Sequence, residues 1–187
     1  MQTTDNQDEI FDVIDHRDRV ISQATRGEVH KDPSLTHRSI TILVFRNGEL
    51  FLQKRSMTKD AFPGVWTCSV AGHVDSGETY EQAAMREMQE ELGIKSVQPP
   101  GVIRERLMSY EKETERTRFF RYEDMTQTPI VLDPNETSEG QFFPVTQELL
   151  AKIGTEMPAT PCLQFLAETY LLERLSSSQK ILTMDAW

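Results

Sequence analysis

The sequence is poor in the features that define several protein classes. It has two cysteines in 187 residues, Cys68 and Cys162. They are too few and too far apart for a disulfide framework or a cysteine metal site, so we expect a reducing compartment, the cytoplasm. No apolar run approaches the roughly 20 residues of a membrane span. The polar, acidic residues 1–9 hold no signal-peptide core, so we expect no membrane partner.

Positive charge is also scarce. Thirty acidic residues face twenty basic ones, which leaves a formal net charge of -10. Such a chain repels polyanions, which argues against a nucleic-acid polymer as a partner. A phosphorylated small molecule would have to be attracted locally, by a metal ion or a basic patch. Hydrophobic residues make up 37% of the sequence, which is enough for the core of one domain.

Strand and helix signals are interleaved along the chain. Short β-branched runs bounded by turn residues predict strands, and longer segments between caps predict helices. The expected strands are 10–14 and 20–21 as a hairpin, 40–46, 49–54, 66–71, 101–110 and 116–122, and the expected helices are 25–30, 79–92, 146–153 and 162–176. Residues 133–140 read as a polar loop and residues 1–8 as a flexible tail. The order predicts one α/β or α+β domain over residues 9–187.

The helix over residues 79–92 has the clearest boundaries. Thr79 and Gln82 form a capping box at its start, and Gly93 supplies the residue that ends it. A glycine-rich loop over residues 72–77 leads directly into this helix. Backbone groups of the loop can therefore come close to whatever the helix binds.

Three glutamates share one side of this helix. At 100° per residue, Glu87, Glu90 and Glu91 fall within about 100° of arc, beside an apolar face. Each like-charged neighbour pair costs roughly 0.2–0.5 kcal/mol on an exposed helix. The pattern alone is compatible with a solvated acidic face and with a divalent cation site. Magnesium would suit such a site because it prefers oxygen ligands and shares its remaining positions with phosphates.

The spacing of the whole segment favours the cation site. Gly72, Glu78 and the run REMQEELGI over residues 86–94 match every fixed position of the Nudix box, so the chain resembles the Nudix hydrolases. The resemblance implies a Nudix fold, in which a mixed β-sheet lies between helices. It also implies hydrolysis of a small-molecule diphosphate, often linked to a nucleoside. Homodimers are common in this family.

The resemblance further implies a role for each matched position. Metal binding or its support would fall to four positions: Glu87, Glu90, Glu91 and the carbonyl of Gly72. The cation would be Mg²⁺, or Mn²⁺ in its place. Arg86 would orient the glutamates by charge-assisted pairs, and Glu78 would fix the loop. A glutamate would orient or deprotonate a metal-bound water, and we favour Glu90 for that task.

Outside this segment, roughly residues 8–125 resemble the isopentenyl diphosphate isomerase-like branch of the superfamily. Arg55 and Lys59 stand where that branch binds diphosphate. Three histidines stand at positions of isomerase metal ligands and would form a second metal site: His30, His37 and His73. Glu113 and Glu115 would be their acidic companions.

One position departs from the isomerase pattern. The isomerase uses a cysteine just before a Gly-His pair to move a proton on an allylic carbon, and here that residue is Ala71. Cys68 lies three residues earlier, and an odd offset on a strand points the other way. We therefore expect a Mg²⁺-dependent hydrolase. An isomerase without that cysteine and a non-catalytic diphosphate sensor are the alternatives, and the intact glutamates argue against the sensor.

Overall fold

The computed structural model describes residues 5–126 and 129–177. Its strands are β1 (Ile10–Ile14), β2 (Val20–Thr25), β3 (His37–Arg46), β4 (Glu49–Arg55), β5 (Trp66–Thr67), β6 (Val70–His73), β7 (Gly101–Ser109), β8 (Thr114–Glu123) and β9 (Thr137–Pro144). Its helices are α1 (Arg26–Val29), α2 (Tyr80–Leu92), α3 (Gln147–Lys152), α4 (Pro161–Leu166) and the π-helical turn η1 (Ala167–Leu171). No helix in the described ranges has both the length and the hydropathy to cross a bilayer.

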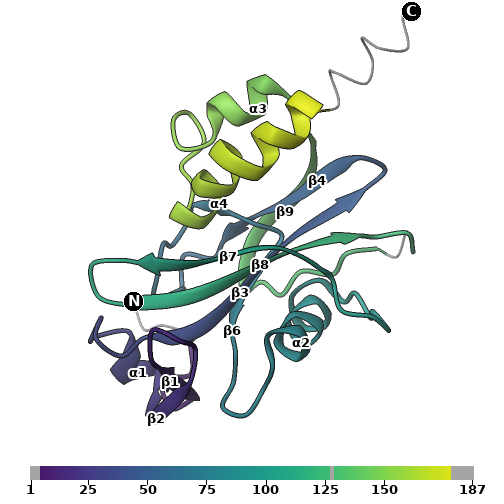
Figure 1. Ribbon diagram of the computed structural model, residues 1–187. Coiled ribbons are helices and arrows are strands. Elements are labelled where there is room, and N and C mark those ends of the chain that lie inside the picture. The colour runs from purple at the N-terminus through teal and green to yellow at the C-terminus, as the bar shows by residue number, and fades with distance from the viewer. Residues whose placement is uncertain (1–4, 127–128, 178–187) are drawn as a thin grey trace, which may run out of the picture.

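Strand β3 is the centre of one mixed sheet (Figure 1). It pairs antiparallel with β1, β4 and β6, and parallel with β8. Strand β2 extends the sheet beyond β1, β7 extends it beyond β8, and β4 also pairs with β5 and β9. Most strands come close to the predicted ranges, so the expected mixed sheet is confirmed.

The apolar run of β3 is buried on both faces. Ile42 and Val44 belong to a core cluster that also contains Met88 of α2. Leu43 and Phe45 point the other way, into a cluster with α4 and η1. Figure 1 shows α2 below the sheet and α3 and α4 above it. Because successive residues of a strand face opposite sides, a continuous apolar run produces a sheet covered by helices on both faces.

Two of the expected segments differ in the structure. The single strand predicted over residues 66–71 is divided into β5 and β6, because the Ser69 side chain takes part in the sheet. Its hydroxyl accepts a hydrogen bond from the amide of Val44 at 2.7 Å and donates one to the carbonyl of Phe51. The loop predicted over residues 133–140 ends in a strand, because β9 starts at Thr137 and pairs with β4.

The structure describes the two ends of the chain only in part. Residues 1–4, half of the predicted tail, and residues 178–187 of the predicted domain lie outside the described residues. Asp5, by contrast, forms ion pairs with Lys59 and Arg26. The predicted helix 162–176 starts at Pro161, passes through η1 and continues to residue 177.

Strand β1 also fixes the glycine-rich loop that precedes α2. The Asp12 carboxylate accepts hydrogen bonds from the Ser76 hydroxyl at 2.8 Å and from the Gly77 amide at 3.1 Å. The loop is therefore anchored to the sheet just before the N-terminal cap of α2.

Candidate active site

The glutamates of α2 meet the end of β6. Glu91 is 7% exposed. Its carboxylate accepts hydrogen bonds from the Ala71 amide at 3.2 Å and from the Gln53 side chain. Glu87 lies directly against Gly72, and a Cβ atom on that glycine would collide with its carboxylate. A glycine is needed at this strand end because the carboxylate occupies the volume that a side chain would take.

Arg86 ties the loop to the helix. Its Nε and Nη2 donate to the two carboxylate oxygens of Glu78 at 3.0 and 2.9 Å. Its Nη1 donates to Glu87 at 2.7 Å and to Glu90 at 3.1 Å, and Nη2 also donates to the carbonyl of His73 at 3.0 Å. One guanidinium thus fixes the loop, the helix and the strand end relative to one another.

Burial beside α2 disfavours the ionised forms of two of the three glutamates. Burial raises the pKa of Glu87 to about 7, and burial together with the nearby Glu87 raises the pKa of Glu91 to about 8. The Glu90 side chain differs, because it is 57% exposed. A pair of buried oxygen donors with unfavourable charge, next to the backbone of Gly72, fits a hard divalent cation. Glu87, Glu91 and the Gly72 carbonyl would hold it, with support from Glu90.

The two predicted diphosphate contacts line the same cleft as the glutamates. Arg55, at the end of β4, donates through Nε to the carbonyl of Ala61 at 2.8 Å. Lys59 is almost buried and forms ion pairs with Asp5 and, at 2.7 Å, with Glu136. The fold therefore brings the α2 glutamates and the two basic side chains to the lining of one cleft.

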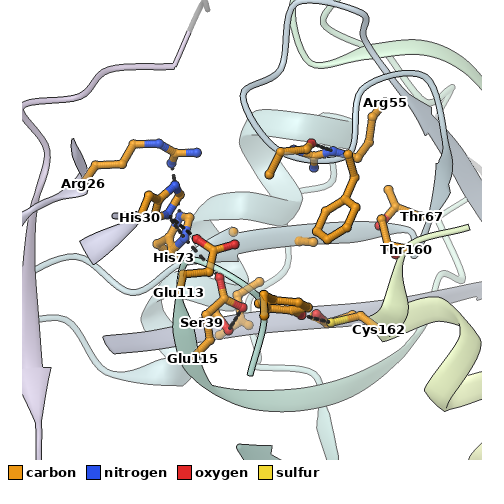
Figure 2. A pocket seen from close by; sticks show the side chains of 17 residues that line it. Arg26, His30, Ser39, Arg55, Thr67, His73, Glu113, Glu115, Thr160 and Cys162 are labelled. Carbon is orange, nitrogen blue, oxygen red and sulfur yellow. Dashed lines mark hydrogen bonds and ion pairs between the residues drawn. The ribbon is translucent and has the colours of Figure 1, made fainter. Parts of the chain in front are cut away.

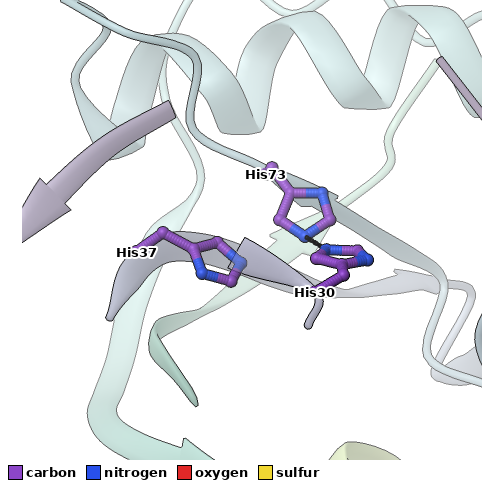
Figure 3. A group of neighbouring side chains, drawn as sticks. All are labelled: His30, His37 and His73. Carbon is purple, nitrogen blue, oxygen red and sulfur yellow. Dashed lines mark hydrogen bonds between the residues drawn. The ribbon is translucent and has the colours of Figure 1, made fainter. Parts of the chain in front are cut away.

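The three predicted histidines also come together (Figure 3). His30 caps the C-terminal end of α1, His37 starts β3 and His73 ends β6. One nitrogen of each lies within 4.8 Å of the others. The Nε2 atoms of His30 and His73 are 3.2 Å apart. Three segments that are distant in sequence thus point their imidazoles at one spot.

The expected acidic companions face these histidines (Figure 2). Glu113 lies just before β8, with an oxygen 3.2 Å from His30 Nε2, and Glu115 of β8 lies 3.4 Å from His73 Nε2. We call these five residues the histidine–glutamate cluster: His30, His37, His73, Glu113 and Glu115.

The chemistry of this cluster fits a metal. His37 Nε2 is buried and makes no hydrogen bond within the described residues. Burial lowers the pKa of His37 to about 3 and raises the pKa of Glu113 to about 7. The imidazole is therefore neutral, and burial disfavours the ionised form of the Glu113 carboxyl group. Neutral imidazoles beside carboxylates are the donors that zinc, manganese and iron take.

A small chamber separates the cluster from α4. Figure 2 shows Cys162 at the far end of this chamber from His73. The Tyr110 hydroxyl lies 3.2 Å from the Cys162 sulfur, and Phe62 and Ala71 also line the space. Cys68 is fully buried in the apolar core with Phe119 and others. The cysteine near the Gly-His pair is thus a core residue, whereas the distant one faces the chamber.

Sequence reasoning missed several residues of the site. Arg26 lines both the cleft and the chamber, and the signal for it is its spacing of four from His30, one helical turn. Gln53 stands in the buried part of an apolar strand, and a polar residue at such a position indicates a buried partner. Cys162 carries no local signal, because only the fold brings it next to Tyr110, which begins a segment expected to influence substrate choice.

Comparison with known proteins assigns the family. A model of the NUDIX domain matches residues 35–160. An uncharacterised Nudix hydrolase of Pseudomonas aeruginosa is 30% identical over 155 residues, which cover 82% of this chain and 88% of the relative. A Nudix hydrolase of Deinococcus radiodurans is 34% identical over 79% of this chain and 85% of its own. An isopentenyl-diphosphate Delta-isomerase of Photorhabdus laumondii is 44% identical over 46% of this chain and 49% of its own.

Solved structures are similar to this chain in fold. The crystal structure of DR0079 from Deinococcus radiodurans superposes with a TM-score of 0.66 and 27% identity, over 86% of this chain and 98% of that one. A MutT protein from Methanosarcina mazei has a TM-score of 0.64 at 19% identity, over 76% of this chain and 96% of that one. The second match shows the shared fold alone.

Proposed function

Because this chain belongs to the Nudix hydrolase family and is a hydrolase of diphosphate bonds, we propose that it cleaves a nucleoside diphosphate derivative with Mg²⁺, or with Mn²⁺ in its place. The observation that carries the proposal is one cleft lined by both the α2 glutamates and basic side chains. Burial raises the pKa of Glu87 and Glu91, and a bound cation would favour their ionised forms. Arg55 and Lys59 line the same cleft, so a metal–diphosphate complex would meet partners for both of its charges.

Each residue around the proposed cation site has its own role in metal binding or positioning. Glu87, Glu91 and the Gly72 carbonyl would hold the cation, which would supply charge neutralisation on the diphosphate and activation of the attacking water. Arg86 keeps the carboxylates in place through its bonds to Glu87 and Glu90.

We assign Glu90 as the base because its carboxylate is the exposed one of the three and is held by Arg86 at one oxygen. A fixed, hydrated carboxylate beside the cation can orient the attacking water and accept its proton. Glu78 acts indirectly, since it anchors Arg86 with both oxygens.

In the same cleft, Arg55 and Lys59 contact the diphosphate. Lys59 is paired with Asp5 and Glu136, so a substrate phosphate must take the place of at least one carboxylate. The organic group of the substrate would extend toward the chamber beside Phe62. An aromatic ring there offers a stacking surface for a base or an apolar contact for another group.

We assign the histidine–glutamate cluster to a second divalent cation. The buried, unbonded Nε2 of His37 supports this assignment, because a buried polar atom without a partner is costly unless a ligand satisfies it. The mixed nitrogen and oxygen donors favour a transition metal such as Mn²⁺ or Zn²⁺ over Mg²⁺.

The same cluster favours one second candidate, allylic isomerisation of a short prenyl diphosphate, since two isomerases are among the relatives. The absence of a cysteine at Ala71 and the core position of Cys68 argue against it. Hydrolysis needs neither residue.

The test is a mass-spectrometric turnover screen with Mg²⁺ or Mn²⁺. The panel contains nucleoside di- and triphosphates, nucleotide sugars, dinucleotide cofactors, coenzyme A and isopentenyl diphosphate. We expect metal-dependent release of a phosphomonoester or phosphate. Glu91→Gln should lower the rate by at least about 100-fold, the scale of losing one preorganised charge at a reacting centre.

Glu81→Gln is the matched control, because Glu81 is on the same helix but pairs with Arg118. It should retain the wild-type rate. Conversion of isopentenyl to dimethylallyl diphosphate without hydrolysis of any compound would refute the proposal in favour of the isomerase.

A further inference from the structure

Arg26 connects the two parts of the site. It is 8% exposed and lines both the cleft with the glutamates and the chamber beside the histidine–glutamate cluster. Its Nη1 lies 3.2 Å from Nδ1 of His73, a contact drawn in Figure 2. Its guanidinium also pairs with Asp60 at 3.3 Å. It pairs with Asp5 at 3.4 Å and with Glu9 at 3.6 Å, and these two residues line the cleft.

The contact with His73 decides where the proton of that imidazole sits. A guanidinium only donates hydrogen bonds, so Nδ1 must be the acceptor. A neutral imidazole carries one proton, which is then on Nε2. That nitrogen is the atom that faces the cluster, 3.2 Å from His30 Nε2 and 3.4 Å from Glu115. With a proton on it, Nε2 has no lone pair to offer a metal.

Metal binding through His73 needs the opposite arrangement. Nε2 must be unprotonated so that its lone pair can bind the metal. The proton is then on Nδ1, which needs a hydrogen-bond acceptor. Arg26 cannot be that acceptor, and its charge would oppose the cation. The Arg26–His73 hydrogen bond and metal ligation by His73 therefore exclude each other.

From this geometry we propose that Arg26 is a positioning residue that couples the anion cleft to the histidine–glutamate cluster. An anion in the cleft draws Arg26 away from His73 and frees the imidazole to bind a metal. A metal on His73 in turn releases Arg26 to the anion, because coupling between two binding equilibria is reciprocal. The proposal rests on the second metal site proposed above.

Arg26 can leave His73 without losing all its partners. Its three carboxylate partners are Asp5, Glu9 and Asp60. Their oxygens lie 3.4, 3.6 and 3.3 Å from the guanidinium. A phosphate adds to this group or replaces a member of it. Two things change between the two states: the Arg26 guanidinium leaves Nδ1 of His73, and the imidazole proton moves from Nε2 to Nδ1.

The first test reads the proton directly in the wild-type protein. Long-range ¹H–¹⁵N correlation spectra distinguish the two tautomers of a histidine, and His73→Gln assigns the signal. After chelator treatment we expect His73 with its proton on Nε2, and with Zn²⁺ we expect the proton on Nδ1. A proton on Nδ1 in the metal-free protein overturns the proposal, and this result does not depend on any variant at Arg26.

The second test measures the coupling with Co²⁺, whose visible absorption reports ligation by nitrogen. Glu87→Gln with Glu91→Gln removes the α2 site, so that only the cluster contributes. Sulfate, which binds Co²⁺ weakly, serves as the anion at constant ionic strength. We expect sulfate to tighten Co²⁺ binding at least about fivefold, the lower end of typical coupling.

Substitution of Arg26 should remove the coupling. Arg26→Met should bind Co²⁺ more tightly without sulfate and show no response to it, whereas Arg26→Lys should restore part of the response. Arg19→Met is the control, because Arg19 pairs with Asp15 in the β1–β2 turn. A sulfate effect that persists in Arg26→Met refutes the proposal.

Absence of Co²⁺ binding in every variant would refute this proposal and the second metal site together. It would leave the hydrolase intact, since the turnover loss in Glu91→Gln is measured separately.

Discussion

At the residue scale, Gly72 shows how little space the cation site leaves. The Glu87 carboxylate occupies the place of the side chain that Gly72 lacks. The same residue offers its carbonyl as a ligand in the proposed function. A glycine is required at position 72 because a Cβ atom would collide with the Glu87 carboxylate. The requirement does not come from an unusual backbone conformation.

Gly72→Ala should consequently harm function more than folding. The methyl group must push Glu87 out of its position. Overpacking of this kind costs roughly 1–3 kcal/mol, and a displacement near 1 Å can cost about 100-fold in rate. Thermal unfolding and turnover measure the two effects.

Gly101→Ala is the matched control for this prediction, because a Cβ there meets only ordinary van der Waals contact with Arg121. Gly72→Ala with wild-type turnover would contradict the role assigned to the contact with Glu87.

At the element scale, the sheet depends on one hydroxyl between β3 and β4. Ser69 lies in the gap between β5 and β6 and bonds the amide of Val44 and the carbonyl of Phe51. Both backbone groups belong to strands whose side chains form the two cores.

Ser69→Ala should therefore destabilise the fold by about 2 kcal/mol, since it leaves a buried donor and a buried acceptor unpaired. For a chain of this size, that corresponds to a Tm lower by about 4–8 °C. Ser138→Ala should change Tm little, because Ser138 is exposed. An unchanged Tm in Ser69→Ala would show that another group satisfies the two strands.

What the sequence predicts well is local. The caps of α2 were readable because Thr79, Gln82 and Gly93 lie within or next to the helix they bound. The break at Ser69 and the start of β9 at Thr137 depend on partner strands, so no local pattern revealed them. The contact of Arg26 with His73 joins residues 47 positions apart, which only the fold decides.

At the scale of the whole molecule, the residues that line the cleft come from distant parts of the chain. Glu87 and Glu91 come from the middle of the sequence, whereas Asp5 and Arg26 come from its first residues. A cation bound by this cleft contacts only the folded state, because the unfolded chain does not assemble the ligands.

Mg²⁺ should therefore raise thermal stability. At a concentration 100 times its Kd, a ligand of the native state adds about 2.7 kcal/mol, which predicts a Tm higher by roughly 5–10 °C. Differential scanning fluorimetry with and without a chelator measures it. Glu91→Gln should lose most of the shift and Glu81→Gln should keep it, and equal shifts in both would place the cation elsewhere.

The pairing of β3 with β8 gives the histidine–glutamate cluster a further meaning. His37 stands opposite Glu115 in that parallel ladder, and Ser39 stands opposite His73 in the antiparallel one. A slip of one residue in either ladder would turn Glu115 or His73 to the other face of the sheet. If the cluster binds a metal as proposed, a chain in which β8 pairs with β3 one residue out of register would lack the full set of donors. The appearance of metal affinity during refolding would then report when the sheet reaches its final register.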